Sequence, residues 1–493
     1  MKKVEVGKEE GSRKVKLTNT LIRVSVASSL LSMQHGYNLW IVYSPSALMQ
    51  DFYNISKVEE MKDPETQMVL IGITFALFPF GGIFGALTVG YLVDKFGREW
   101  VSLRILGTAY RPEALLSWTP SDGFPWSFIL FCSRSLRISC ICIISSVVPL
   151  YIGEVAPKSL RGGMIAMSLF FMNTGVVVAQ IGALREILGT KKGWPILMGL
   201  AGLMPLTQLA LLFSCPESPR YLLIQKRDEQ SAREALKSLR ERRNVDDEIE
   251  ELRQEDLAER TEKAMTSFKL LRNPNLQWHV ITIIVLMGGQ QLSGVNAAYY
   301  YSERIFLSTK VGIDNVRFVT IAITALLWIG FFLAIFLADS MGRRTLALIG
   351  FGISAIICIL ITMTLEMQDT IQEMTYISTI LLESFLFAYT LGPGPVPLIL
   401  TVELFLQSTR SSACVIAGFV QWFINFLTGV SFYHIETRIG PYCFLIFFPI
   451  CAATFFYIFK MVPETKDRTF LDVRRIMAIH TARKIQVQGP AGK

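Results

Sequence analysis

The sequence predicts an all-α polytopic membrane protein, and two properties of the chain support this prediction. Hydrophobic side chains make up 51% of the 493 residues and charged ones only 18%, with a mean hydropathy of +0.42. The apolar residues also gather in stretches whose length is close to the roughly 20 residues that a spanning helix needs. Backbone groups inside a bilayer must be satisfied within their segment, and the stretches lack the alternation of barrel strands, so we expect helices.

Eleven stretches are long and apolar enough to cross a bilayer. In the first half of the chain they span residues 18–43, 68–92, 127–150, 163–185 and 194–215. In the second half they span residues 276–302, 316–338, 345–366, 376–401, 411–434 and 441–462. The charged start of the chain is followed by no obvious cleavage site, so we expect no cleavable signal peptide.

Basic residues between the stretches predict the orientation. Lys and Arg concentrate before residue 18, at 95–98, 158–161, 343–344 and 410, and after 466. Under the positive-inside rule all of these clusters should be cytoplasmic. This arrangement requires a further crossing between residues 99 and 126, which would make twelve helices with both termini in the cytoplasm.

Segment 99–126 is the crossing that the sequence supports least. It carries Arg104, Arg111 and Asp122, and it contains the loop-like run "TPSDGFP". An arginine in the middle of a bilayer costs about 2.5–3.5 kcal/mol on insertion scales. We therefore expect this segment, the third helix, to insert poorly.

An internal repeat predicts two related bundles of six helices. "DKFGR" at 94–98 is echoed by "DSMGRR" at 339–344, Glu154 and Arg161 by Glu403 and Arg410, and "PESPR" at 216–220 by "PETKDR" at 463–468, with offsets of 245, 249 and 247 residues. The bundles would span 18–215 and 276–462, with cytoplasmic tails at 1–17 and 463–493. Parallel repeats of this kind are typical of secondary transporters, in which two bundles rock around a substrate.

A charged segment, 216–275, separates the two bundles. Apolar residues such as Ala232, Leu236 and Leu239 recur at helical spacing within it, so it reads as a cytoplasmic helical linker. Two interpretations stay open at this point: a solvated tether, or a helical bundle that docks beneath both halves.

Several functional classes are not supported by the sequence. The eight cysteines lie in or beside apolar stretches without a zinc-type pair, and the four histidines lack metal-ligand spacing, so we expect buried thiols and no metal or cofactor. The net charge of +8 does not indicate nucleic-acid binding, because the basic residues cluster where the positive-inside rule expects cytoplasmic segments. There is no phosphate loop for ATP and no catalytic constellation, so we do not expect an enzyme.

Eight ordered motifs carry a resemblance to a known family. The chain is similar to the sugar porter branch of the major facilitator superfamily, and most like the fructose-type (class II) facilitative hexose transporters of animals. The matching motifs are "DKFGR" 94–98, "YIGEVAPKSLRG" 151–162, "CPESPRYLLIQKRDE" 215–229, "LMGGQQLSGVNAAYYY" 286–301, "DSMGRR" 339–344, "GPGPVP" 392–397, "ELFLQSTR" 403–410 and "VPETKDRTF" 462–470. The resemblance covers nearly the whole chain except about 99–132.

The resemblance implies a sugar site, gates and an ion-pair network. "GGQQLSGVN" resembles a broken seventh helix whose amides bind sugar hydroxyls; the alternative is that these amides hold helices together. The implied binding residues are Gln290, Gln291, Asn296, Gln421, Trp422 and Asn425. The implied gates are Tyr299 and Tyr300 outside and the helix break at Gly392, Pro393 and Pro395. The implied cytoplasmic network is Asp94, Arg98, Arg134, Glu154, Arg161, Arg343, Arg344, Glu403 and Arg410.

The resemblance also implies a plasma-membrane uniporter for fructose, glucose or both, working by alternating access on a monosaccharide. Asn38 stands where proton-coupled sugar porters carry an aspartate, and Glu383 is the one intramembrane acid that could couple protons. Asn54, in "NIS", is a plausible glycan acceptor.

A non-transporting sensor or inactive variant is the alternative function. Three polar positions of the family's site are changed here, to Leu169, Leu327 and Tyr389, and Ile138 and Cys142 replace close-packing glycines. Together with segment 99–126, these changes are the observations on which that alternative depends.

Overall fold

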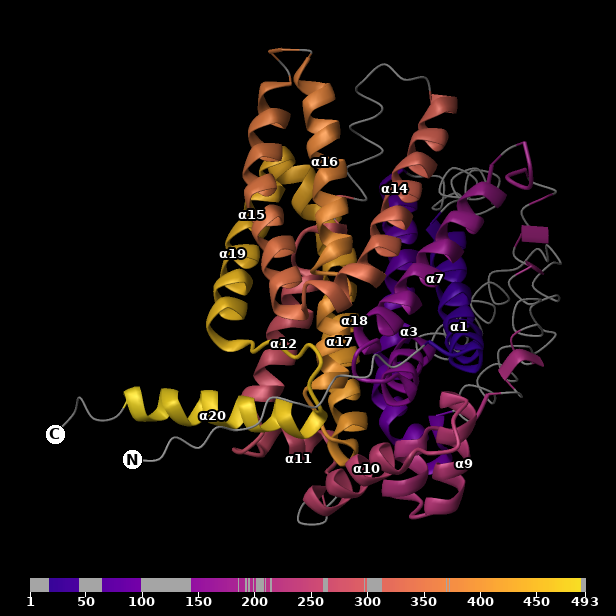
Figure 1. Ribbon diagram of the computed structural model, residues 1–493. Helices are drawn as coiled ribbons and strands as arrows, with labels where there is room; N and C mark the ends of the chain where they lie inside the picture. The colour runs from indigo at the N-terminus through magenta and orange to yellow at the C-terminus, as the bar shows by residue number, and fades with distance from the viewer. Residues whose placement is uncertain are drawn as a thin grey trace.

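The computed structural model describes residues 17–43, 64–98, 143–259, 265–298 and 313–488, apart from short gaps at 185, between 191 and 214, and at 297, 369 and 372. Within these residues the regular structure is helical (Figure 1). Six helices in this part of the chain are long and apolar enough to cross a membrane. The fold is thus all-α, as predicted; segment 99–126 lies outside the described residues.

The first half of the chain contributes four described helices. They are α1 (Asn19–Tyr43), α3 (Pro64–Phe96), a shorter apolar helix (Ile143–Val155) and α7 (Arg161–Gly182). Val89, Val93, Val147 and Ile152 are buried among them. Their branched and apolar side chains meet away from the lipid-facing surface, which is how a helix bundle in a membrane packs.

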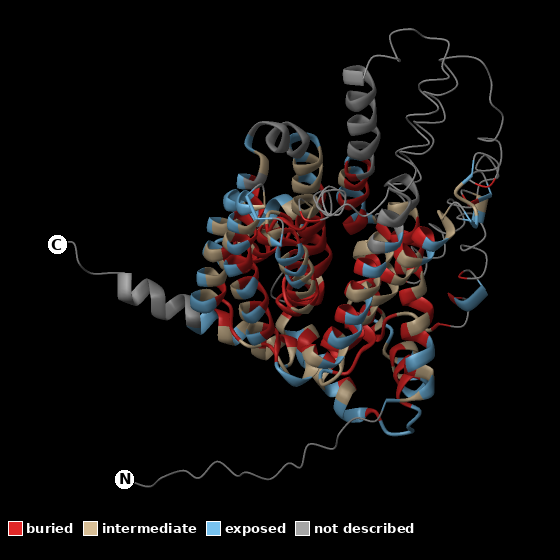
Figure 2. Cartoon of the chain, turned by 90° about the horizontal axis from the view of Figure 1, so that it is seen from above, coloured by how far each residue is buried: buried red, intermediate tan, exposed pale blue. Residues whose placement is uncertain are grey.

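The second half forms a neighbouring bundle. Its helices are α12 (Gln277–Gln291), α14 (Ile313–Ser340), α15 (Arg343–Met367), α16 (Met374–Leu391), α17 (Val396–Glu403), α18 (Gln407–Ile439) and α19 (Cys443–Met461). Buried residues lie between the helices, and exposed ones face outward (Figure 2). Ile356, Ile380 and Phe456 are large apolar side chains on that outer surface, where lipid would cover them.

Among the described helices, the most extensive packing between the halves is that of α3 against α18 and of α7 against α14. Small residues allow the first approach, since a Cβ atom at Gly90 would lie 2.8 Å from Val415. Polar contacts support the second: Trp328 Nε1 on α14 donates to Thr174 Oγ1 on α7 at 2.8 Å. The fold thus places any site on α12 and α18 beside the interface between the halves.

The linker forms its own small bundle at one end of the molecule, called here the linker end. It contains η2 (Tyr221–Gln225), α9 (Glu229–Arg240), α10 (Asp246–Glu259) and α11 (Ser267–Arg272). Leu236, Val245 and Ile249 are buried at its centre. Arg240 donates to the Val155 carbonyl at 3.2 Å, so the described linker is docked on the spanning helices rather than free.

A final helix, α20 (Phe470–Gln488), lies in the predicted C-terminal tail. It runs across the linker end, roughly perpendicular to the spanning helices (Figure 1). Val473 and Met477 are each 1% exposed and pack into the main core. The start of this helix is therefore part of the folded structure.

Candidate functional site

The predicted seventh span is broken in its middle. Helix α12 stops at Gln291, and Gly294 takes a φ of +97°, a conformation that residues with a Cβ atom rarely adopt. A Cβ atom at Gly294 would also lie 2.7 Å from the ring of Phe447. Residues 295, 296 and 298 are helical again. The glycine therefore permits a break that separates the two glutamines from Asn296.

The amides beside this break contact neighbouring elements. Gln290 Nε2 donates to a carbonyl of the turn between α16 and α17 at 2.7 Å, whereas its buried Oε1 accepts no hydrogen bond from a described residue. Gln291 Oε1 accepts from Asn425 Nδ2 of α18 at 3.4 Å. Asn296 Nδ2 donates to a threonine hydroxyl of α18 at 3.3 Å. Bonds this long are weak, so these amides keep capacity for another hydroxyl partner.

Trp422 brings the first half of the chain to the same place. The side chain is buried, and a Cβ atom at Gly82 of α3 would lie 2.4 Å from the indole ring. The ring centroid of His35 on α1 lies 5.7 Å from that of Trp422. Gln421, the preceding residue, is half-buried. Through Trp422, the α18 part of the predicted site therefore lies next to α1 and α3 of the other half.

The break between α16 and α17 is part of this region. Gly392, Pro393 and Pro395 lie in the turn 392–395, between the two helices. A Cβ atom at Gly392 would lie 2.4 Å from the Leu346 carbonyl of α15, so the turn packs closely on that helix. The Gly394 carbonyl accepts the Gln290 bond described above. The predicted gate and the amides are thus in direct contact.

The three altered positions behave differently from one another. The side chain of Leu327 is 1% exposed and packs in an apolar cluster of the second half. Leu169 is half-buried on α7. Tyr389 is half-buried on α16, and a Cβ atom at Gly394 would lie 3.4 Å from Cε1 of its ring. The ring of Tyr389 therefore lies beside the turn that accepts the Gln290 bond, and the effect of this residue on the polarity of the site stays a prediction.

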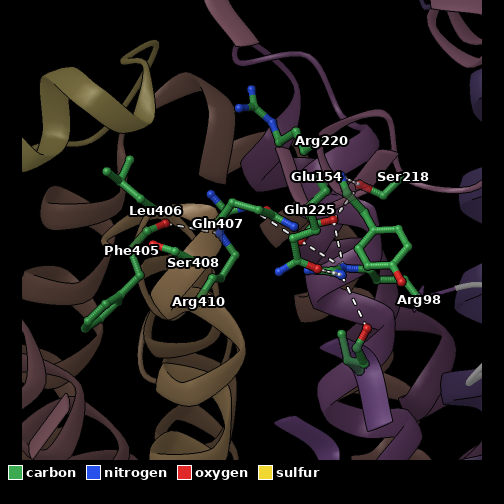
Figure 3. A network of polar contacts seen from close by, with 12 residues as sticks. Arg98, Glu154, Ser218, Arg220, Gln225, Phe405, Leu406, Gln407, Ser408 and Arg410 are labelled. Atoms are coloured by element: carbon green, nitrogen blue, oxygen red, sulfur yellow. Dashed lines mark hydrogen bonds and ion pairs between the residues drawn. The ribbon is translucent and has the colours of Figure 1, made fainter. Parts of the chain in front are cut away.

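A cluster of buried charges closes the linker end of the first half (Figure 3). Arg98 Nε lies 3.1 Å from Glu154 Oε2, and both side chains are fully buried. Arg98 also donates through its guanidinium to Gln225 at 3.0 Å and through its backbone N–H to Glu217 at 3.1 Å. Ser218 donates its hydroxyl to Glu154. The ion pair with Arg98 and the bond from Ser218 satisfy the Glu154 carboxylate, as a buried charge requires.

The second half repeats this arrangement. Arg343 lies 3.0 Å from Glu403. The backbone N–H of Arg343 donates to Glu464 at 2.9 Å, and the Thr465 hydroxyl donates to Glu403. Each residue occupies the position that the sequence repeat assigns to its counterpart in the first half. The motifs with constant offset therefore build two related polar clusters.

Other contacts join one half to the other at the linker end. Arg410 of α18 lies 3.5 Å from Glu154 Oε1, and Ser411 of the same helix donates to Asp94 at 2.8 Å. Asp339 of α14 accepts from a backbone N–H in the first turn of α7 at 3.0 Å. Asp94 thus joins the other half through a hydrogen bond to the start of a helix. The two halves are held together at this end.

Acids of the linker extend the cluster. Glu255 pairs with Arg220 and lies 3.7 Å from Arg410. Glu259 accepts the backbone N–H of Ser408 at 3.1 Å, which satisfies a free donor at the start of α18. Burial raises the pKa of the Glu259 carboxyl and lowers the pKa of the Arg220 guanidinium to about 9. The linker therefore binds both halves.

Some predicted residues are placed differently or not described. Arg344 makes no ion pair with a described residue; its guanidinium donates to the Phe459 carbonyl at 2.7 Å. Arg161 is buried but likewise has no ion-pair partner within the described part of the chain. Four predicted positions lie outside the described residues: Asn54, Arg134, Tyr299 and Tyr300.

Sequence reasoning did not assign roles to several residues of the network. Glu217, Ser218, Glu464 and Thr465 lie inside the motifs that revealed the repeat. Their offset of 247 residues, which lies between the offsets of 245 and 249 of the assigned charges, was the available signal. Glu255 and Glu259 carry no such signal, because their partners depend on how the linker docks.

Comparisons with known proteins fit this geometry. The family described as "Sugar (and other) transporter" matches residues 24–477. Human "Solute carrier family 2, facilitated glucose transporter member 5" is 44% identical over 449 residues, covering 90% of this chain and 89% of that protein. Human member 7 of the same family is 38% identical over 471 residues, covering 95% and 92%.

Solved structures show the same fold. The proton:xylose symporter XylE bound to 6-bromo-6-deoxy-D-glucose aligns with a TM-score of 0.80 at 20% identity, over 94% of this chain and all of that one. An inward-open XylE from E. coli aligns with a TM-score of 0.64 at 20% identity, over 92% and 99%. The chain belongs to the sugar transporter family and has the major facilitator fold.

Proposed function

We propose that the protein is a facilitative hexose transporter that works by alternating access, with fructose, glucose or both as substrate. The observation that carries this proposal is the group of amides at the break of α12, which contacts α18, the helix whose Trp422 lies beside α1 and α3 of the other half. The relatives named as facilitated glucose transporters, which align over nine-tenths of the chain, support it.

The amides suit a sugar because a hydroxyl both donates and accepts hydrogen bonds, as a carboxamide does. Gln290 keeps a buried acceptor without a described partner, and Gln291 and Asn425 share only one long bond. Each new bond would contribute about 0.5–1.5 kcal/mol, so a few of them give millimolar affinity. A carrier benefits from this weakness, since it must release what it binds.

The buried charges at the linker end suit a reversible closure. Contacts such as Arg410 with Glu154 join the halves in this structure, so access to the amides would come from the opposite end. Rocking the halves apart would break these contacts and open the linker end. The turn at 392–395 would hinge during this change, and Tyr300 with Tyr299 would gate the other end.

The transport that we propose is passive. Asn38 has no titratable group, and its Nδ2 donates to the Gln34 carbonyl one turn earlier at 2.8 Å. Glu383 is half-buried on α16, and it is not one of the amides at the break of α12. The sugar gradient alone would drive net movement, without ATP or a nucleic-acid partner.

We further propose a plasma-membrane location with both termini and the linker in the cytoplasm. The basic residues at the linker end support this orientation under the positive-inside rule. Glycosylation at Asn54 would fit the opposite, extracellular side.

Uptake into liposomes tests the proposal. Purified protein should give saturable entry of radiolabelled fructose or glucose above the rate of protein-free vesicles. Gln291→Ala should lower uptake at low sugar concentration about tenfold, because it removes a bond to the sugar and leaves Asn425 unpaired. Gln230→Ala, the same change on the exposed surface of α9, should leave uptake unchanged.

The result that contradicts the proposal is equally clear. If folded wild-type protein shows no saturable flux for either sugar, the protein does not carry these hexoses. The alternative of a non-transporting membrane protein would then take its place.

A further inference from the structure

A single aromatic ring lies among three buried arginines at the linker end. Phe470, the first residue of α20, is 2% exposed. Its ring centroid lies 3.9 Å from the Cζ atom of Arg161, 4.1 Å from that of Arg410 and 4.5 Å from that of Arg220. The negative face of an aromatic ring attracts cations at such distances.

The three arginines come from three parts of the protein. Arg161 begins α7 in the first half, and Arg410 lies near the start of α18 in the second half. Arg220 precedes η2 at the start of the linker. One side chain of the C-terminal helix therefore contacts both halves and the linker at once.

The arginines differ in how well their charges are otherwise balanced. Arg220 and Arg410 each have glutamate partners, including the Glu255 that they share. Arg161 is 1% exposed, and its Nε has no hydrogen-bond partner among the described residues. A buried charge without an ion pair is costly, so the close contact with the ring and the longer-range attraction of Glu403 stabilise the Arg161 guanidinium here.

We propose that Phe470 is a positioning residue that holds the linker end closed. This inference rests on the alternating-access function proposed above. When the halves rock apart, Arg161 and Arg410 must separate, and one ring then no longer contacts both. The attraction is therefore present in the closed arrangement and lost on opening, so the C-terminal helix favours the state in which the sugar site opens away from the linker.

The ring acts separately from the docking of α20. Val473 and Met477 pack in the main core, whereas the contacts of Phe470 named here are to guanidinium groups. Replacing Phe470 by leucine keeps an apolar side chain and removes the aromatic face. Phe470→Tyr and Phe470→Trp keep that face. Val473→Ala weakens the packing of α20 without touching the ring and serves as the matched control.

A native thiol reports opening. Cys414 lies one turn after Arg410 on α18 and is only 5% exposed while the end is closed. Full-length protein in liposomes is treated with a membrane-permeant maleimide, and mass spectrometry measures the alkylation rate at Cys414. Sugar uptake is measured in the same vesicles, and a thermal melt verifies that each variant is folded.

Phe470→Leu should raise the alkylation rate at Cys414 about tenfold and raise the KM for external sugar, because fewer molecules present the outward-open site. Phe470→Tyr and Phe470→Trp should keep both values near wild type, and Val473→Ala should change neither. Arg161→Lys, which keeps the charge but loses the planar group, should act like Phe470→Leu.

Two outcomes overturn the inference. One is an unchanged Cys414 rate in both folded Phe470→Leu and Arg161→Lys. The other is an equal increase in Phe470→Leu, Phe470→Tyr and Phe470→Trp, which would show that shape alone matters. The alkylation assay requires no transport, so absent uptake by wild type would count against the proposed function instead.

Discussion

The two polar clusters at the linker end are related by the sequence repeat, yet they bond across the interface between the halves in different ways. In the first, Glu154 contacts Arg98 of its own half and Arg410 of the other. In the second, Glu403 contacts Arg343, but Arg161, the counterpart of Arg410, has no ion pair with it within 4 Å and lies on Phe470 instead.

This difference shows that a repeat in sequence does not impose equal energetics. Arg410 contacts both a carboxylate and the ring of Phe470, whereas Arg161 has that ring but no carboxylate within 4 Å among the described residues. An ion pair depends on a fully satisfied carboxylate in a buried setting, whereas a ring contact tolerates small shifts of the cation. The closed end therefore combines one strict contact with one adaptable contact.

The strongest test compares the two glutamates. Glu154→Gln leaves Arg98 and Arg410 with a weaker partner, and removing one member of a buried pair costs about 3–5 kcal/mol. Because Arg410 comes from the other half, part of this cost falls on the closed state alone. Glu154→Gln should therefore raise the Cys414 alkylation rate more than tenfold, whereas Glu403→Gln should raise it far less.

Thermal melts separate this effect from general damage. Both variants should lower the melting temperature, since both glutamates pair with an arginine of their own half. Equal alkylation rates in the two variants would show that the clusters contribute equally to closure, and the comparison would then fail.

A second test examines what the clusters share. Gly97 and Gly342 take φ values of +90° and +91°, and a Cβ atom at either would lie 2.5 Å from the carboxylate of Glu217 or Glu464. Gly97→Ala and Gly342→Ala should each destabilise the protein by about 1–3 kcal/mol, because the strained backbone and the displaced carboxylate both raise the free energy of the folded state. The thermal melt measures both effects.

Gly429→Ala is the matched control, since it adds a methyl group to a spanning helix where no atom of the described residues lies within 4 Å. It should be neutral or slightly stabilising. If only one of the two turn glycines proves sensitive, the equivalence of the two turns at the linker end is wrong.

The sequence predicted the fold and the places of several candidate site residues, because both depend on local patterns. The predicted spans 316–338, 345–366 and 441–462 coincide closely with α14, α15 and α19, since apolar length alone defines a spanning helix. The break after Gln291 and the paired clusters followed from glycines and repeated motifs. Each of these features depends on a short segment of the sequence.

Other features depend on contacts between distant segments. Nothing in the run that contains Glu255 or Glu259 indicates that these acids reach Arg410 and Ser408, because the docking of α10 decides it. Phe470 is one apolar residue among many in sequence, and only the fold surrounds it with arginines.

The smallest expected effect concerns pH at the linker contact of α18. Burial raises the pKa of Glu259 above its ordinary value of 4.5, although the Ser408 N–H and the positive charges of Arg410 and Arg220 oppose this rise. If opening hydrates Glu259, its pKa falls back, so the closed state binds the proton more tightly. Lowering the pH through the range between the pKa values of Glu259 in the open and closed states should then favour closure, and raising the pH should favour opening.

The Cys414 alkylation rate, corrected for the pH dependence of the reagent with an exposed thiol peptide, should therefore fall on acidification by less than tenfold, since one pKa unit corresponds to about 1.4 kcal/mol. Glu259→Gln keeps an acceptor for the Ser408 N–H and has no titrating group, so its rate should be flat over the same range. A wild-type rate that rises on acidification would show that Glu259 stabilises the closed state as a carboxylate. The linker would then resemble the Glu154 cluster more than the ring contact of Phe470.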